Sequence, residues 1–266
     1  MRRIDKYIYS YKVGFQSATE YRMDFILSIF ASIFPIFVQY FVWKAVFSAT
    51  PVYNGYTFNS MMLYIIVATV VSRFVSAGFE YEISSDIKNG HLSRFITMPV
   101  SYLFFRVFRF LGQKIIHLVI CALILICLSF IMKMLSFELV YHQLFLFIIS
   151  IILALILNFI IFYIVSTISF WMAEIWGVVI ALRLVINIAS GGILPIAVFG
   201  ESIASVLNVL PFKYTISFPL SILLDDIPLG EVMEGFALQC VWIAVFAILA
   251  KIAWDRGMKK YIAAGG

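Results

Sequence analysis

Apolar residues in this chain form long blocks separated by short polar segments. A helix needs about 20 apolar residues to cross the roughly 30 Å hydrocarbon core of a bilayer. Six blocks approach or exceed this length and predict spanning helices: Phe25–Phe47, Phe58–Phe79, Ile115–Met132, Leu144–Trp171, Ile175–Phe199 and Phe236–Trp254. Because the strand alternation of a lipid-facing barrel is absent, the pattern predicts an all-α, polytopic membrane helical bundle, one transmembrane domain over 1–266.

The segment before the first block alternates apolar and polar residues with a helical period instead of forming a continuous apolar run. Over residues 1–24 the apolar positions recur at steps of three and four, from Ile4 to Ala18, and the basic residues lie mostly off that stripe. This spacing favours an amphipathic helix on the inner membrane face over a frayed basic tail. No small-residue cleavage site follows a short apolar core, so we expect an uncleaved first span.

Lys and Arg are distributed unevenly between alternate segments. The N-terminal arm, the loop at 80–114 and the C-terminal end carry fourteen of them, whereas the segments on the opposite side carry two. Because cytoplasmic loops are enriched in Lys and Arg, the bias predicts six crossings with both termini in the cytoplasm.

The composition narrows the class of protein. Hydrophobic residues make up 64% and charged residues 12% of the 266 positions, with a mean hydropathy of +1.05. Soluble domains carry about 25% charged residues, so a soluble enzyme, a disordered chain and a secreted disulfide scaffold are excluded. The net charge of +5 is accounted for by the topology signal, and we expect no nucleic-acid partner. The three cysteines are scattered and predict no disulfide framework or zinc site.

Sequence signatures of catalysis are absent. The chain has no GxxxxGK[ST] phosphate loop, no GxSxG and no HExxH, so we expect no catalytic or metal-ligating residues. All fourteen Asp and Glu lie outside the cores of the predicted spans, with Glu80, Glu82 and Glu174 flanking them. Proton-driven carriers usually need an acid or a histidine relay in the membrane. If this chain moves a substrate uphill, we expect the energy to come from a partner.

The second inner loop contains a short predicted helix, Glu80–Asn89. Glu80 and Glu82 begin it, where acidic side chains complement the helix dipole, and Gly90 is placed to stop it in the left-handed conformation. Ile83 and Ile87 lie four residues apart and form a small apolar ridge. Two interpretations of the ridge stay open: a docking surface for a cytoplasmic partner, or packing against the chain's own bundle.

A second unusual segment interrupts the fifth block. Gly191, Gly192 and Pro195 break a helix, because Gly is flexible and Pro removes a backbone donor. A short helical stripe then runs from Ile203 to Leu210, and prolines follow at 211 and 219. Broken backbone at membrane depth is tolerated only inside protein or beside a cavity. We therefore predict a re-entrant hairpin at the outer side, over 190–219.

Arg183 lies deep in the fifth block. A charge at this depth is costly and is expected to face the bundle interior, a partner, a backbone break or an anionic ligand. Snorkelling to the membrane surface is the alternative for Arg183 and the expectation for Arg73 and Lys44.

The order of these features resembles that of the ABC type-2 permeases, the membrane subunits of ABC exporters. The resemblance covers nearly the whole chain. It rests on the amphipathic arm with Arg22-Met-Asp-Phe25, on Glu82-Ile83 to Gly90 with Met98-Pro99, on Ser190-Gly-Gly-Ile-Leu-Pro195 with Pro211-Phe-x-Tyr214, and on the tail from Arg256 to Gly266.

The resemblance implies partners and roles. Two permease chains, identical or sister subunits, would pack around a substrate path in the bacterial plasma membrane. A cytoplasmic ABC ATPase dimer, which binds ATP and Mg²⁺, would dock on their cytoplasmic side. The coupling residues would be Glu80, Glu82, Ile83, Asp86, Ile87 and Gly90. The outer gate would comprise Gly191, Gly192, Pro195, Pro211, Phe212 and Tyr214. Related systems export drugs, peptides, lipids or glycans.

Two other functions are weighed against an ATP-driven exporter. An ion-coupled secondary transporter or channel would need a polar set inside the spans. An intramembrane enzyme would need a convergent catalytic set at one depth, and the sequence shows none.

Overall fold

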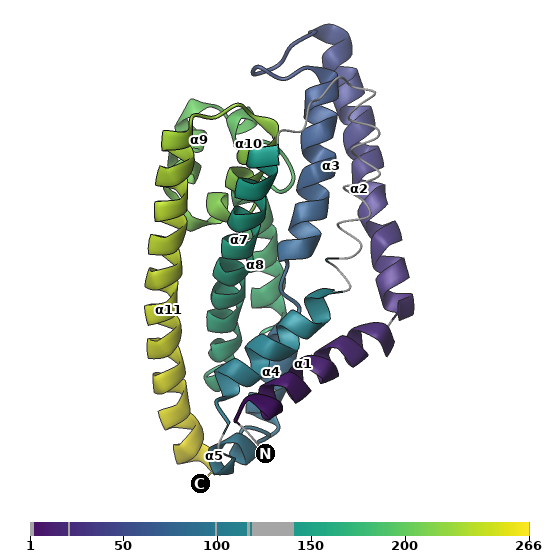
Figure 1. Cartoon of the computed structure of the whole chain (residues 1–266). Coiled ribbons are helices and arrows are strands. Elements are labelled where there is room, and N and C mark those ends of the chain that lie inside the picture. Colours follow the sequence, from purple (N-terminus) through teal and green to yellow (C-terminus); the bar gives the residue numbers. More distant parts are fainter. Residues whose placement is uncertain (1–2, 21, 99, 116–117, 119–140, 266) are drawn as a thin grey trace.

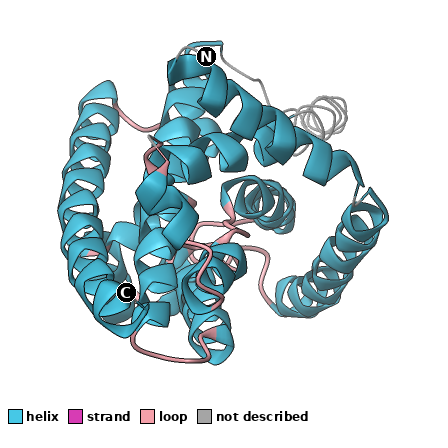
Figure 2. Ribbon diagram, turned by 90° about the horizontal axis from the view of Figure 1, so that it is seen from below, coloured by secondary structure: helices cyan, strands magenta, loops and turns pink. Residues whose placement is uncertain are grey.

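The computed structural model describes residues 3–20, 22–98, 100–115, 118 and 141–265. The described chain is a bundle of helices without strands, joined by short loops (Figures 1 and 2). The helices are α1 (Arg3–Glu20), α2 (Arg22–Ala49), α3 (Phe58–Val75), α4 (Glu80–Lys88), α5 (Ser93–Thr97), a helical stretch over 102–115, α7 (Tyr141–Thr167), α8 (Trp176–Ala189), α9 (Glu201–Val209), α10 (Ser217–Leu224) and α11 (Leu229–Gly265), with 3₁₀ turns η1 (Ile168–Phe170), η2 (Ile196–Phe199) and η3 (Pro211–Thr215). The predicted all-α membrane helical bundle is thereby confirmed.

Three described helical segments are long and apolar enough to cross a membrane. They occupy Phe58–Lys88, which comprises α3 and α4, Tyr141–Phe170, which comprises α7 and η1, and Leu229–Tyr261 within α11; two shorter apolar helices occupy Phe34–Ala49 and Trp176–Ala189. These segments correspond to the predicted first, second, fourth, fifth and sixth spans. The predicted third span, Ile115–Met132, lies almost entirely outside the described residues.

One predicted boundary is confirmed and another needs correction. The predicted break in the fifth block is present: its helix ends at Ala189, because Gly191 adopts a φ of +79° that an α-helix does not allow. The helix of the sixth span is longer than its apolar block and begins at Leu229, directly after Pro228. Proline is well tolerated before or at the start of a helix, where its missing N–H leaves no backbone bond unmade.

The core of the bundle surrounds α7. Its inward face is fully buried at Ala154 and Leu157 and packs against α10, α11 and α4. α1 begins, and α11 ends, at the end of the bundle that also holds α4 and α5 (Figure 1). We call this end the α4 end. The opposite end, which holds α9 and the α2–α3 loop, is called the α9 end.

The N-terminal helix α1 lies obliquely across the α4 end (Figure 1). It contacts the 102–115 helix so closely that a Cβ added to Gly14 would lie 2.1 Å from the Arg109 carbonyl oxygen, and one added to Gly112 would lie 2.1 Å from that of Tyr11. Two glycines thus allow the backbones to touch. The predicted N-terminal helix is present, and it packs on its own chain along this face.

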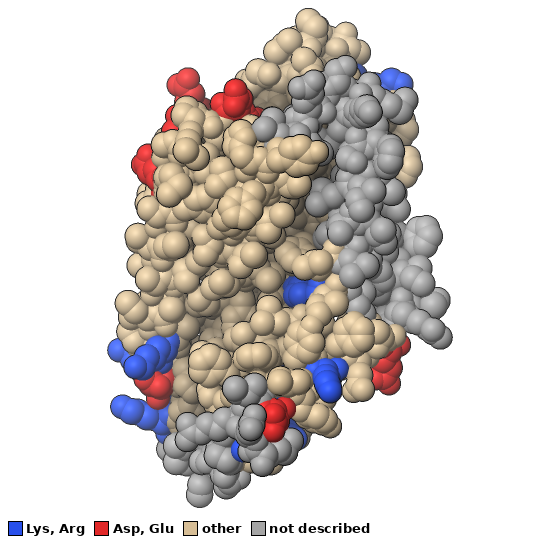
Figure 3. Space-filling view, in the orientation of Figure 1, with Lys and Arg blue, Asp and Glu red and all other residues tan. Residues whose placement is uncertain are grey.

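Charged atoms gather at the two ends of the visible face. A broad band between them is almost free of Lys, Arg, Asp and Glu, apart from a blue area in its lower half (Figure 3). The α9 end shows mostly acidic side chains on the left, and the α4 end shows most of the basic ones. A band of this kind is what a lipid-embedded surface requires.

Candidate functional site

The short helix α4 forms where the sequence predicts it. Glu80 and Glu82 lie in its first turn, Lys88 lies in its last, and the helix ends before Gly90, whose φ is +74°. The left-handed stop at Gly90 is therefore confirmed.

The apolar ridge of α4 faces inward. Ile83 is fully buried and Ile87 nearly so, both in the same hydrophobic core as α7. Of the two interpretations of the ridge, packing against the chain's own bundle is the one that the structure shows. The solvent-facing positions of α4 are instead Tyr81, Ser85 and Lys88, followed by Asn89.

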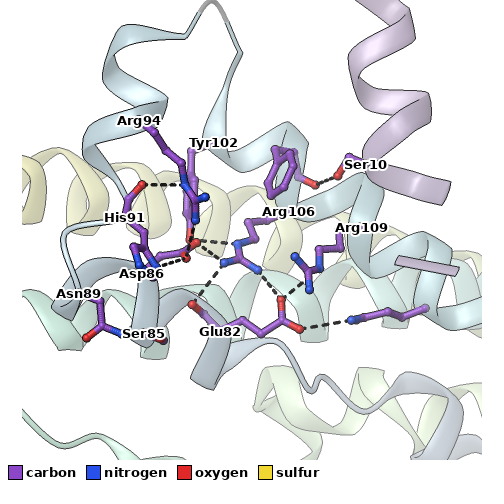
Figure 4. Close-up of polar contacts among 12 residues, drawn as sticks. Ser10, Glu82, Ser85, Asp86, Asn89, His91, Arg94, Tyr102, Arg106 and Arg109 are labelled. Carbon is purple, nitrogen blue, oxygen red and sulfur yellow. Dashed lines mark hydrogen bonds and ion pairs between the residues drawn. The ribbon is translucent and has the colours of Figure 1, made fainter. Parts of the chain in front are cut away.

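A buried arginine fixes the other side of α4. Arg106, from the 102–115 helix, has a side chain only 4% exposed and forms ion pairs with Glu82 and Asp86 (Figure 4). Its Nε donates to the Tyr102 hydroxyl at 3.0 Å, and that hydroxyl donates to Asp86 Oδ2 at 2.8 Å. Because each buried polar group has a partner, this network holds α4 rigidly against the 102–115 helix.

The charge of this network follows from its geometry. Burial lowers the pKa of the Arg106 guanidinium, but Tyr102, Asp86 and Glu82 together raise it more, so the net shift is upward. Burial raises the pKa of the Tyr102 hydroxyl far above its usual value. Arg106 therefore stays charged and Tyr102 stays protonated at any physiological pH.

Weaker contacts extend the network outward to α1. Arg109 Nε lies 3.3 Å from Glu82 Oε2, and His91 Nδ1 lies 3.6 Å from Asp86 Oδ1. Ser10 of α1 donates from Oγ to the Phe105 carbonyl at 2.8 Å. α1, α4 and the 102–115 helix thus form one connected unit at the α4 end (Figure 4).

The first residue of α4 is tied to the fifth span. Arg183 Nη2 donates to both carboxylate oxygens of Glu80, at 2.8 and 3.0 Å, and to the Ala77 carbonyl at 3.3 Å. Arg183 therefore faces the bundle interior rather than snorkelling. Glu80 flanks its span, as the sequence predicts, but its side chain is fully buried, which the sequence pattern does not indicate. Glu80 can be buried because Arg183 compensates its charge.

The predicted outer hairpin leaves α8 and returns beside it. Ser217 N donates to the Ser190 carbonyl at 2.9 Å, which joins the two ends of the hairpin. The Tyr64 hydroxyl of α3 donates to the Gly191 carbonyl at 2.8 Å, and Gln239 Nε2 of α11 donates to the Tyr214 carbonyl at 2.8 Å. The irregular backbone is thus held by side chains from two long helices.

The predicted gate residues occupy different environments within this hairpin. Gly191 makes the left-handed turn, and Pro195 directly precedes η2. Pro211 and Tyr214 are buried in η3, whereas Phe212 between them is half-buried. The intervening α9 has no buried residue. The structure brings these residues into one segment at the α9 end, and their role as a gate stays a prediction.

Sequence reasoning missed the residues that hold both segments in place. The sequence pattern predicts only a topology role for Arg106 and no role for Gln239 and Asn158. A polar side chain inside an apolar block was the available signal, since Gln239 is fully buried and Asn158 donates to the Val75 carbonyl at 2.7 Å. Among the described residues no group of three His, Cys, Asp or Glu is placed to hold a metal ion.

A buried charge network anchors a short helix at one end of the bundle, and a broken helix is tied at the other, in a chain with several helices apolar enough to cross a membrane. A family model described as "ABC-2 family transporter protein" matches residues 33–265. The chain belongs to this family and is a permease subunit of an ABC transporter. No curated protein matches the chain.

Proposed function

We propose that this chain is the membrane subunit of an ATP-driven exporter in the bacterial plasma membrane. Separate ABC ATPase subunits would bind ATP and Mg²⁺ and dock at the α4 end, and a second permease chain, identical or a sister subunit, would complete the path. Family membership and the excess of Lys and Arg at the inner segments support this arrangement, with both termini in the cytoplasm. Drugs, peptides, lipids and glycans remain the candidate substrates.

The observation that carries the proposal is the two-sided character of α4. Its inner side is locked by Arg106 and by burial of Ile83, so a push on α4 is transmitted to the bundle. Its outer side exposes Tyr81 and Ser85 beside the α7–α8 turn, where Glu174 forms an exposed ion pair with Lys88 at 3.2 Å. We assign the docking contact to this outer side.

Co-purification with a co-expressed ABC ATPase that binds the unaltered chain tests the assignment. We expect Tyr81→Ala combined with Ser85→Arg to reduce the recovered ATPase at least fivefold without altering the thermal unfolding of the permease. Both positions are solvent-facing, so the change affects docking rather than folding. The matched control is Ile203→Ala with Ser205→Arg on exposed α9, which should recover the ATPase fully. Undiminished recovery with the α4 variant would refute the docking role.

An ion-coupled secondary transporter is favoured by one observation, the buried carboxylate of Glu80. This alternative predicts uptake or efflux in vesicles that hold an ion gradient but no nucleotide and no ATPase, abolished by Glu80→Gln. We expect no such transport, because Glu80 is already paired with Arg183.

A further inference from the structure

A cavity of about 350 Å³ lies between α2, α3, α7, α8 and the outer hairpin. It extends from Ala77, at the junction with α4, to Gly192 and Thr215 in the hairpin. It therefore spans the distance between the coupling unit and the predicted gate.

Two arginines line this cavity, Arg73 of α3 and Arg183 of α8. Among the described side chains, Glu80 is the carboxylate that pairs with Arg183, and no ion pair involves Arg73. The described wall therefore carries an excess of positive charge, with Arg73 exposed and Arg183 partly exposed. Such a charge excess is costly and attracts an anion.

Unsatisfied polar atoms support a ligand in this place. Arg183 Nε and Ser72 Oγ are buried and have no hydrogen-bond partner in the described structure. The Arg183 side chain is nevertheless 38% exposed, and both residues line the cavity. A guanidinium with an unused N–H binds carboxylate or phosphate oxygens well, since its donors match their planar geometry.

The rest of the lining is apolar. Ile65, Phe162 and Ile216 form walls, and Pro35 and Ile36 of α2 form an edge beside Phe34 and Phe37, which are 72% and 60% exposed. A hydrocarbon tail fits against such a surface, whereas a free inorganic ion gains nothing from it.

We propose that this cavity binds the anionic head, a phosphate or a carboxylate, of an amphiphilic substrate whose tail lies along α2. That the bound amphiphile is the substrate rests on the proposed function. Binding itself is a property of this chain alone, so the two claims fail separately.

Binding is tested on the full-length chain in phosphatidylcholine nanodiscs, with lysophosphatidic acid as the anionic probe and lysophosphatidylcholine as its zwitterionic twin. We expect saturable binding of lysophosphatidic acid at least tenfold tighter than of lysophosphatidylcholine. Arg73→Gln should weaken it about tenfold, as loss of a charge-assisted contact does, while Lys44→Gln at another site should not. Equal binding of the two probes, or an unaffected Arg73→Gln, overturns the proposal.

A neutral double variant separates ligand binding from charge compensation. Glu80→Gln with Arg183→Gln removes both charges of the pair, so the bundle keeps no uncompensated carboxylate at this position and should fold. We expect it to lose the preference for lysophosphatidic acid. Wild-type binding in this variant would show that Arg183 only neutralises Glu80, and would refute the assignment of Arg183.

Two further measurements separate the sources of the anion. Sodium phosphate should not displace lysophosphatidic acid at equal concentration. If it does displace the probe, the cavity is a site for free anions, and the proposal of an amphiphilic ligand is overturned.

In the complex with its ATPase, lysophosphatidic acid should raise ATP hydrolysis at least twofold, and Arg73→Gln should abolish the increase. Binding without stimulation would identify a resident membrane lipid and overturn the substrate claim. Failure of the ATPase to co-purify would instead refute the proposed function and leave the binding result standing.

Discussion

Arg183 of α8 holds both carboxylate oxygens of Glu80 of α4, at 2.8 and 3.0 Å. The two partners differ in their surroundings, because the Glu80 side chain is fully buried and that of Arg183 is 38% exposed. An ion pair thus connects a broken membrane helix directly to the helix that we assign to docking.

This difference in exposure predicts unequal effects of removing either partner. Arg183→Gln leaves a buried carboxylate without its counter-charge and should lower the free energy of unfolding by about 3–5 kcal/mol. Glu80→Gln leaves an arginine that reaches the cavity, so its cost should be clearly smaller. Equilibrium unfolding of the purified chain in detergent measures both. An equal loss of unfolding free energy in the two variants would contradict this prediction.

Arg106 should be among the most sensitive positions of the α4 end. Arg106→Gln would leave Asp86 and Tyr102 buried without their charged partner, and we expect a loss of about 3–5 kcal/mol. Glu174→Gln is the control, since it breaks the Lys88 ion pair in which the glutamate is 85% exposed and should cost less than about 1 kcal/mol. A shift in unfolding midpoint that is the same for both variants would argue against the network.

The close approach of α1 to the 102–115 helix depends on glycine. Gly112→Ala would place a methyl group 2.1 Å from the Tyr11 carbonyl oxygen, so the helices must separate, at a cost of about 1–3 kcal/mol. Gly177→Ala is the matched control in α8, where an added Cβ has no neighbour within 4 Å. There the substitution lies in the first turn of the helix and should stabilise by less than the roughly 0.5–1 kcal/mol that alanine gives in a helix interior. Thermal unfolding of the two variants should shift in opposite directions.

The outer hairpin should loosen when its bond to α3 is removed. Tyr64→Phe deletes the hydroxyl that donates to the Gly191 carbonyl and should cost about 1 kcal/mol. Hydrogen exchange should accelerate at the hairpin amides, notably that of Ser217, which bonds to Ser190. Tyr53→Phe on the α2–α3 loop is the control, because the exposed Tyr53 side chain shows no hydroxyl bond within the described residues. Unchanged exchange in Tyr64→Phe would mean that the hairpin is held by packing alone.

Long apolar blocks and helix punctuation made most of the fold predictable. The helix break at Gly191 and the helix stop at Gly90 follow from the conformational freedom of glycine, which can be read from a single sequence. The direction of the Ile83 ridge did not follow, because an amphipathic helix with a charged rim suits either a partner or its own bundle. The structure decides it through Arg106, which lies 24 positions from Glu82 in the chain.

The partnership of Glu80 with Arg183 was equally out of reach from sequence. The two residues are 103 positions apart, and Glu80 flanks the second span whereas Arg183 lies inside the fifth, so no helical period relates them. Only the three-dimensional structure shows that a deep arginine and a boundary glutamate neutralise each other. The cavity beside them likewise depends on where five elements meet.

The length of α11 has a mechanical consequence. At 1.5 Å per residue its 37 residues extend about 55 Å, well beyond a bilayer core of about 30 Å. Near one end Gln239 holds the Tyr214 carbonyl, and near the other the Tyr261 and Ser93 hydroxyls share a hydrogen bond at 2.9 Å. A single stiff rod thus touches both faces of the protein. Any sliding of that rod along its own axis would be registered on the two sides of the membrane at once.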